Sequence, residues 1–170
     1  MNGGVGQYGN FRRYYYINPG FNGYYTGWIR SGVDEWVHTT SGVGVTTSIS
    51  IYETTTKSDA MFEFLNSSYY GDGIFGKTEL YLYQERIPDE EIGTRNWGWA
   101  KMVINTQFMD NCNLLANYQK KAICMHEMGH AMGLSHHNTS VYDLMYPKGN
   151  VCRATRATAK ECKLINHLYG

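Results

Sequence analysis

Apolar and polar positions alternate along several short stretches of the chain, which is the pattern of half-buried β-strands. β-Branched and aromatic residues dominate these stretches, and turn formers such as Asn18-Pro19-Gly20 separate them. The pattern predicts five strands, which cover residues 14–17, 46–52, 60–65, 78–83 and 100–105.

Three other stretches are typical of helices. Apolar residues between Trp28 and Val37 recur at helical spacing, and a later stretch rich in helix formers begins at Asn117, a residue that can cap a helix N-terminus. The three predicted helices cover residues 24–37, 117–132 and 158–168. The order of strand, helix, several strands and two further helices predicts an α/β fold, with the later helices under a mixed sheet.

Length and charge narrow the class of protein. The 170 residues suit one domain, over 1–170, with a core of its own. Fifteen Lys and Arg residues balance fifteen Asp and Glu residues, so no overall field attracts nucleic acid or an anionic membrane. No apolar run approaches the roughly 18 residues that span a bilayer. We therefore expect a soluble domain without a nucleic-acid partner or a membrane span.

Four cysteines, at positions 112, 124, 152 and 162, form an even set without C-x-x-C spacing. Such a set favours two disulfides and an oxidising compartment, and four buried thiols are the alternative. We prefer the local pairs Cys112–Cys124 and Cys152–Cys162, while two other pairings stay open. Fifteen tyrosines and a charged fraction of only 18% are also typical of an extracellular surface, because tyrosine combines an apolar ring with a polar tip. These features predict a secreted protein.

One motif carries most of the chemical information. In His126-Glu127-Met128-Gly129-His130 the histidines are four residues apart, which on a helix gives about 40° of rotation and about 6 Å of rise. Both imidazoles therefore leave the same helix face and can bind one metal ion. Glu127 points to the side, where its carboxylate can reach a water on the metal without binding the metal itself.

A third ligand requires the chain to turn back after this helix. Gly133 suits such a turn because glycine readily adopts positive φ, and His136 then completes the pattern H-E-x-x-H-x-x-G-x-x-H. Requiring Gly133 and His136 as well lowers the chance occurrence to the order of one in 10⁵ chains. Structural zinc sites usually have four protein ligands, whereas three histidines leave one position open. The pattern predicts a catalytic zinc bound by His126, His130 and His136.

At this motif the sequence resembles the metzincin clan of zinc proteases, and within it the matrixins. The segment Asp143-Leu144-Met145-Tyr146-Pro147 is similar to the family's Met-turn, and the final Leu-Tyr-Gly is similar to the end of matrixin catalytic domains. The resemblance implies that Met145 lies beneath the three imidazoles as an apolar floor. It covers the C-terminal third of the chain by motif, and the rest only by the order of elements.

The resemblance also implies a fold. We expect a twisted five-stranded mixed sheet with an antiparallel edge strand, and three helices, of which the active-site helix is followed by the Met-turn. Residues 78–83 are the candidate edge strand, to which a substrate peptide would add in extended form. An N-terminal subdomain, 1–133, would hold the sheet and active-site helix, and a C-terminal subdomain, 134–170, the rest of the site. A primed-side pocket would lie between the active-site helix and residues 141–150.

The sequence departs from the matrixin pattern at several points. Matrixins usually bind a second zinc and calcium through histidines and aspartates before the edge strand, yet no histidine occurs between His38 and His126. We therefore expect one catalytic Zn²⁺ and no structural zinc, and calcium is unsupported. His137 replaces the usual serine after the third ligand, and we interpret it as a solvent-facing or ligand-supporting residue. No cysteine matches the family's latency motif, so we expect any inhibitory segment to belong to a removed pro-segment.

Together these observations predict a secreted zinc-dependent endopeptidase that hydrolyses internal bonds of extended protein or peptide substrates. Glu127 would be its general base, accepting a proton from water and passing it to the leaving amine. One alternative is a non-catalytic zinc-containing adhesion module that binds through a tyrosine-rich surface. Another is a zinc hydrolase that acts on compounds other than peptides. The intact Glu127 argues against the adhesion module, which has no need of that carboxylate.

Overall fold

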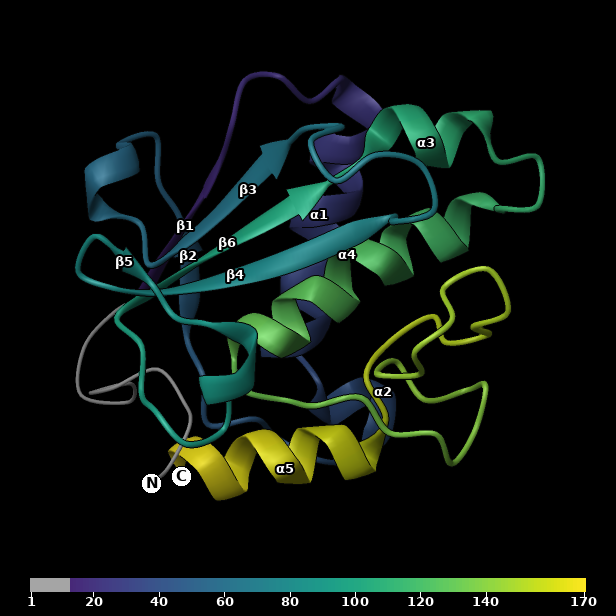
Figure 1. Cartoon of the computed structure of the whole chain (residues 1–170). Coiled ribbons are helices and arrows are strands. Elements are labelled where there is room, and N and C mark those ends of the chain that lie inside the picture. The colour runs from purple at the N-terminus through teal and green to yellow at the C-terminus, as the bar shows by residue number, and fades with distance from the viewer. Residues whose placement is uncertain (1–12) are drawn as a thin grey trace.

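A six-stranded mixed sheet runs through the middle of the protein, with the strand order β2-β1-β3-β6-β4-β5 (Figure 1). The computed structural model describes residues 13–170. The strands are β1 (Arg13–Ile17), β2 (Ile51–Glu53), β3 (Phe62–Asn66), β4 (Gly76–Leu82), β5 (Glu85–Arg86) and β6 (Trp99–Ile104). Strands β1, β2, β3 and β6 are parallel, whereas β4 is antiparallel to both β6 and β5. The predicted mixed sheet with an antiparallel edge is confirmed.

Helix α4 lies below β4 and β6, and α1 packs beside it (Figure 1). The helices are α1 (Gly23–Val37), α2 (Thr40–Val43), α3 (Thr106–Asn111), α4 (Asn117–Ala131) and α5 (Ala159–Tyr169), and two 3-10 turns are η1 (Lys57–Asp59) and η2 (Asp89–Glu91). The long helices α1, α4 and α5 are the three predicted ones, and α2 and α3 are short additions. At the start of α4, the cap position belongs to Ala116 rather than to the predicted Asn117, and Ala116 N donates to Gln119 Oε1 at 3.0 Å.

Two details of the predicted sheet are wrong. The sheet has six strands instead of five, because the chain turns back after β4 and adds the two-residue strand β5 to its outer edge. The second predicted strand, residues 46–52, shrinks to β2 at Ile51–Glu53. Just before it, the buried Thr47 hydroxyl donates to the carbonyl of Trp36 at 2.7 Å, so this stretch is fixed to the end of α1 instead of joining the sheet.

Helices α1 and α4 approach each other closely. Gly32 on α1 faces Met125 on α4, and a Cβ atom at Gly32 would lie 2.7 Å from Met125 Cγ. Next to this contact, the buried indole of Trp36 donates a hydrogen bond to the carbonyl of Met125 at 3.1 Å. These contacts fix α4, which carries the two histidines of the motif, against the core.

The expected disulfides are absent from the structure. All four cysteines have free thiols, and Cys124, Cys152 and Cys162 are buried while Cys112 is partly exposed. The preferred pairs 112–124 and 152–162 are therefore wrong for this structure, which instead has the alternative of free thiols. Burial raises the pKa of the Cys124 thiol to about 12, so it stays protonated at neutral pH.

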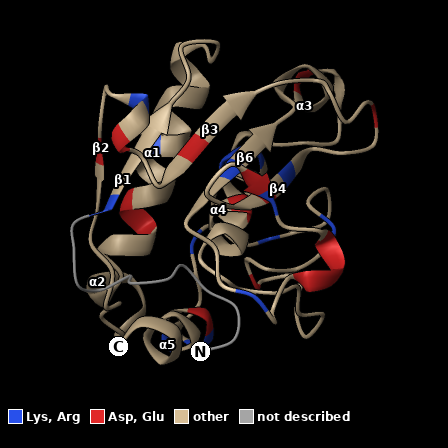
Figure 2. Cartoon of the chain, turned by 60° about the vertical axis from the view of Figure 1, so that its left-hand side comes forward, with Lys and Arg blue, Asp and Glu red and all other residues tan. Residues whose placement is uncertain are grey.

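Charged residues of both signs are interspersed along the chain (Figure 2). Many form ion pairs, such as Arg30 with Glu53 at 2.7 Å and Lys77 with Asp89 at 2.7 Å. Among residues 13–170, no helix is long and apolar enough to cross a membrane. The zero net charge of the sequence thus corresponds to local pairing of opposite charges rather than to separate patches.

The turn between β4 and β5 contains a residue in an unfavourable backbone conformation. Tyr83 has φ of 55°, and its carbonyl accepts a hydrogen bond of 2.7 Å from the indole of Trp99. Asparagine tolerates positive φ better than tyrosine, and the Tyr83 side chain is 84% exposed, so little packing would be lost. We expect Tyr83→Asn to raise the free energy of unfolding by about 0.5–1 kcal/mol.

Thermal unfolding checks this expectation. A chain of this size should gain roughly 1–4 °C in Tm. Tyr69→Asn is the matched control, because Tyr69 is 83% exposed and does not have positive φ. Equal changes in the two variants would contradict the assignment of strain to Tyr83.

Candidate active site

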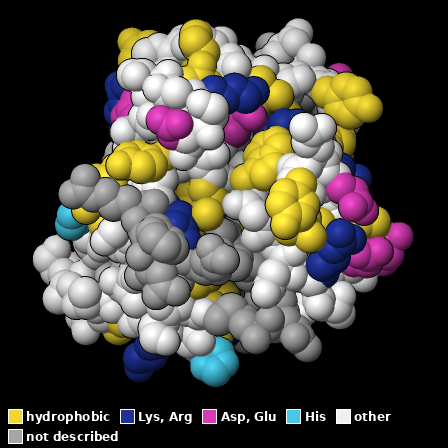
Figure 3. Space-filling view, turned by 90° about the vertical axis from the view of Figure 1, so that its left-hand side faces the viewer, with side chains coloured by type: hydrophobic (Ala, Val, Ile, Leu, Met, Phe, Trp, Pro, Cys, Tyr) yellow, Lys and Arg dark blue, Asp and Glu magenta, His cyan; other side chains and the backbone are white. Residues whose placement is uncertain are grey.

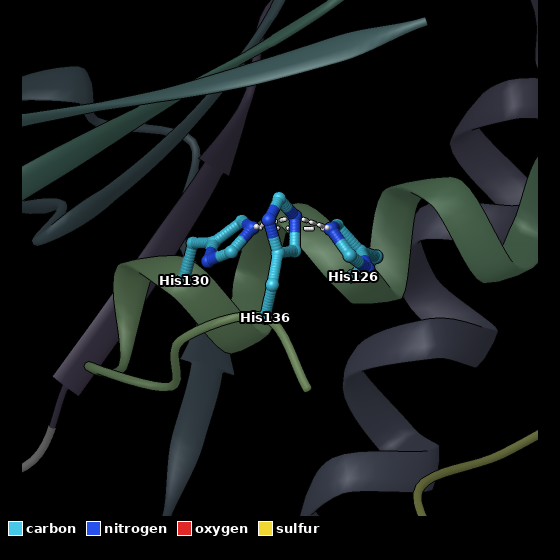
Figure 4. Close-up of side chains that lie close together, drawn as sticks. All are labelled: His126, His130 and His136. Carbon is cyan, nitrogen blue, oxygen red and sulfur yellow. Dashed lines mark hydrogen bonds between the residues drawn. The ribbon is translucent and has the colours of Figure 1, made fainter. Parts of the chain in front are cut away.

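Three histidines point toward one another below the sheet (Figure 4). His126 and His130 lie on α4, and His136 lies on the loop that follows the helix. The Nε2 atoms of His126 and His130 are 3.0 Å apart, those of His126 and His136 are 3.0 Å apart, and those of His130 and His136 are 3.1 Å apart. The structure therefore brings together the three predicted ligands, in a geometry that could hold a metal ion.

The hydrogen bonds of the Nδ1 atoms determine which protonation state the Nε2 atoms have. Nδ1 of His126 is 2.8 Å from the carbonyl of Leu144, and Nδ1 of His130 is 2.8 Å from the carbonyl of Leu134. A carbonyl only accepts hydrogen bonds, so both Nδ1 atoms carry a proton, and in the neutral rings both Nε2 atoms present lone pairs. Two lone pairs that face each other repel unless a cation lies between them. The observed separations are close to the about 3.3 Å expected between two ligands of a tetrahedral zinc at roughly 2.0–2.1 Å, so the residues fit this ion.

Burial keeps these rings neutral. It lowers the pKa of His126 and of His130 to about 4, and it also lowers the pKa of His136. A histidine is a metal ligand only in its neutral form. Both helical histidines are therefore in the ligand form throughout the neutral pH range.

The turn that delivers His136 is a helix-ending motif centred on Gly133. Gly133 has φ of 99°, its N–H donates to the carbonyl of His130, and Leu134 N donates to the carbonyl of Gly129, both at 2.9 Å. This pair of bonds is the Schellman motif, in which the residue after the cap adopts the left-handed conformation that favours glycine. The glycine in the motif is thus needed to reverse the chain and place the third histidine.

The side chain of Glu127 lies between α4 and β4. Its carboxylate Oε2 accepts a hydrogen bond of 2.8 Å from the Thr78 hydroxyl on β4, and its backbone carbonyl lies at the same distance from that hydroxyl. Gly76 leaves space for the side chain, because a Cβ atom there would lie 2.7 Å from Glu127 Cγ. Burial raises the pKa of this carboxyl, and His130 and the Thr78 hydroxyl oppose the shift. The sequence indicated Glu127 but not its support by Thr78, which only the fold brings near.

Met145 packs against α4 at Gly129. It is fully buried, and its sulfur occupies the space that a side chain at Gly129 would need. The preceding residue, Leu144, supplies the carbonyl that orients His126. The Met-turn segment therefore lies against the motif on α4, one residue before His130.

A buried glutamate that the sequence reading missed anchors this turn. Glu161 on α5 is fully buried and accepts hydrogen bonds from Met145 N at 2.7 Å and from Thr158 N and Oγ1 at 2.8 Å. Thr158 and Glu161 also form the capping box of α5, and this T-x-x-E spacing was the available sequence signal. His137 lies 3.5 Å from Glu161 and 3.7 Å from Asp143, and its side chain is 17% exposed, so it is mostly buried beside these carboxylates.

A single open cavity of ≈ 800 Å³ contains the three histidines and Glu127. Ile123 of α4 and Gly149 of the segment after the Met-turn line one part of it, as the predicted primed-side pocket requires. Gln119 holds that segment on α4, because its side-chain N–H groups donate to the carbonyls of Asn150 at 3.0 Å and Cys152 at 3.2 Å. The cavity thus extends along the edge strand on one side and along residues 144–152 on the other.

The fold and this site define a metzincin-like zinc metalloprotease domain. The matrixin family matches residues 29–170, which is most of the chain. The chain therefore belongs to the matrixin family, whose catalytic domains are zinc metalloendopeptidases. A search among curated proteins gives no match.

Several solved structures are similar. They include high choriolytic enzyme 1, a hatching-enzyme zinc protease from the medaka fish Oryzias latipes, with 16% identity, a TM-score of 0.44, and coverage of 79% of this chain and 50% of that one. Myroilysin has 16% identity, a TM-score of 0.43, and coverage of 78% and 52%. Archaemetzincin from Methanopyrus kandleri has 12% identity, a TM-score of 0.48, and coverage of 96% and 98%. This chain spans about half the length of the first two structures.

Proposed function

We propose that the protein is a zinc-dependent endopeptidase that binds its metal through His126, His130 and His136. The observation that carries this proposal is the convergence of three neutral imidazole nitrogens beside a buried carboxylate in an open cleft. A zinc ion bound there would supply Lewis acidity and make water reactive near neutral pH. Met145 would form the apolar floor of the site.

Glu127 is the residue that moves protons in this proposal. It accepts a proton from the attacking water and passes it to the leaving amine. Its raised pKa makes it a better proton acceptor than an exposed carboxylate, which suits this task. Thr78 holds the carboxylate in place and is therefore a positioning residue.

The substrate in this proposal is an extended segment of a protein or peptide, which adds to β4 through backbone hydrogen bonds. Secretion, a removed pro-segment and the absence of a nucleic-acid partner remain predictions, as does the division into subdomains at residues 133 and 134. One catalytic zinc is expected, and calcium is unsupported. The adhesion module is less well supported, because the cleft leads directly to Glu127.

A chelator experiment tests the proposed activity. The purified protein should cleave a denatured protein substrate, lose this cleavage when a zinc chelator is added, and regain it when zinc is restored. The adhesion module predicts no cleavage under any of these conditions. A hydrolase for other compounds predicts chelator-sensitive turnover of esters or amides without cleavage of the protein.

The role of Thr78 gives a second expected result. Thr78→Val keeps the shape of the side chain but removes the hydroxyl that bonds Glu127. A hydrogen bond to a charged group is worth about 1.5–3 kcal/mol, so kcat should fall by roughly 10- to 100-fold with little change in KM. Thr78→Ser keeps the hydroxyl and should retain most of the rate. An equal fall in kcat in Thr78→Val and Thr78→Ser would mean that Thr78 acts by packing alone.

A further inference from the structure

Strand β5 covers part of the outer edge of β4, the edge to which a substrate would add. Glu85 pairs with Leu82 and Arg86 pairs with Tyr81. The pairing extends by one more bond, in which Ile87 N donates to the carbonyl of Leu80 at 2.8 Å. The carbonyl of Leu80 and the β4 residues after it are therefore already paired with the chain itself.

The free part of this edge is short. In a β-strand the backbone groups of successive residues point to alternate sides, and the carbonyl of Leu80 points outward toward Ile87. By this alternation the backbone groups of Thr78 and Gly76 also point outward. The carbonyls of Phe75 and Tyr81 accept from Asn105 N and Gly98 N on the β6 side, so the backbone groups of Lys77 and Glu79 point toward β6. Before Leu80, only Thr78 and Gly76 of β4 thus turn their backbone groups outward, and both lie against Glu127.

The chain after β5 closes the same end of the cleft. Ile87 and Trp97 are both 1% exposed, and the Trp97 indole donates to the carbonyl of Ala131 at the end of α4. Between these anchors, Ile92 and Gly93 line the cavity that contains the three histidines. In Figure 1 this loop descends from the β5 end of the sheet toward α5. Figure 3 views the molecule from this side and shows acidic and basic side chains lying next to each other.

The turn between β4 and β5 contains a backbone conformation that costs free energy. Tyr83 keeps positive φ, with its carbonyl held by Trp99, so that β5 can fold back on β4. Non-glycine residues in this conformation cost of the order of 1 kcal/mol or more and persist where the surrounding structure fixes them, often at functional sites. The hairpin is therefore a fixed wall and not a loosely attached loop.

We propose that the hairpin and the loop to Trp97 limit the substrate, so that the cleft contacts only about two residues on the N-terminal side of the bond that is cut. Residues on the C-terminal side would lie beside the start of β4, which β5 does not cover, where Ile74 and Gly149 line the cavity. This inference rests on the proposed peptidase function and specifies its substrate contacts. Longer N-terminal segments would have to leave the cleft after those two residues.

The direction of the substrate follows from the course of β5. The strand runs antiparallel to β4 up to Ile87, and the chain then turns away at Pro88 into η2, which leaves the edge beside Thr78 free. A peptide that continues along this edge in the direction of β5 is also antiparallel to β4, the slightly more stable pairing. Its N-terminal end then faces Ile87, and its C-terminal end faces the open part of the cleft.

Two series of fluorogenic peptides with a common core test the proposal. One series is lengthened one residue at a time on the N-terminal side, and the other on the C-terminal side. We expect kcat/KM in the N-terminal series to change less than about threefold beyond two residues, while the C-terminal series continues to gain, about tenfold or more over three residues. Peptide affinities for the zinc-loaded Glu127→Ala variant, measured by fluorescence anisotropy, should follow the same pattern.

Two matched variants test which part of the cavity limits the N-terminal side of the substrate. Ile74 precedes β4 and Ile92 follows η2, and both line the cavity. They are similarly exposed, at 37% and 41%, so truncating either should leave the fold intact. Ile92→Ala should raise kcat/KM a few-fold for peptides with three or more N-terminal residues. It should leave the dependence of kcat/KM on C-terminal length unchanged. Ile74→Ala should change only the C-terminal pattern.

The possible outcomes separate this inference from the proposed function. Cleavage that keeps rising with each N-terminal residue, to about tenfold or more beyond the second, would overturn the inference and leave the peptidase function intact. A limit on the C-terminal side instead would overturn the antiparallel orientation. No cleavage and no binding of any peptide would remove the function, and with it this inference.

Discussion

Replacement of Glu127 by alanine should lower peptide cleavage by about 10³-fold while zinc remains bound. General acid–base catalysis by a positioned side chain contributes roughly 10²- to 10⁴-fold. The only other carboxylate that lines the described cavity, Asp89, is paired with Lys77. The fold should tolerate the change. The Thr78 hydroxyl loses the carboxylate but keeps the backbone carbonyl of residue 127 as an acceptor at 2.8 Å.

Zinc content and kcat/KM, measured on the same samples, check this result. His130→Ala is the contrasting variant, because it removes one of three ligand nitrogens and should lose both the metal and the activity. Retained cleavage in Glu127→Ala would rule out its role as general base. Loss of zinc together with activity in that variant would instead make Glu127 a part of the metal site.

The metal site could be predicted from the sequence because its geometry is mostly local. The four-residue spacing of His126 and His130 fixes their convergence once the segment is a helix, and Gly133 provides the reversal that brings His136 round. These relations depend on helix geometry and on one positive φ angle, not on distant parts of the chain. The residues that support the site are different. Thr78 reaches Glu127 across 49 positions of sequence, and no local pattern indicates that contact.

The sheet shows the same division between local and distant effects. Strands with clear alternation, such as β4 and β6, lie within two residues of their predicted bounds. The stretch before β2 has equally β-branched residues but finds other partners. Asn166 on α5 donates to the carbonyl of Thr46 and accepts from Ser48 N, both at 2.7 Å, so these backbone groups are satisfied without a neighbouring strand. A pattern of residue types cannot reveal such a competing hydrogen-bond partner.

Strand β5 was missed for a separate reason. Two residues are too few for any periodic signal, and the turn that forms it contains Tyr83 in place of the glycine or asparagine that usually marks a hairpin.

The state of the cysteines could not be predicted from the sequence either. An even number allows disulfides, but whether two thiols come together depends on the fold, and here all four are free.

Glu161→Ala should destabilise the protein by about 3 kcal/mol or more. The carboxylate is fully buried and accepts three hydrogen bonds, from the N–H of Met145 and from the N–H and hydroxyl of Thr158. Each buried donor that loses its partner costs about 1–3 kcal/mol, and the capping of α5 is lost at the same time. Urea unfolding monitored by tryptophan fluorescence should show a lower midpoint with an unchanged slope.

Two further variants separate the effect of this network from a general effect of removing a carboxylate. Glu161→Gln keeps the size but retains only one acceptor oxygen, so it can serve either Met145 or Thr158 and should lose a smaller part of the stability. Glu90→Ala removes a carboxylate from the surface turn η2 and should change the free energy of unfolding by less than about 0.5 kcal/mol.

Because Glu161 also fixes the backbone of Met145, Glu161→Ala should release zinc to a chelator faster than the unmodified protein does. A variant that is destabilised as expected but keeps the same rate of zinc release would show that Glu161 stabilises the fold without supporting the metal site.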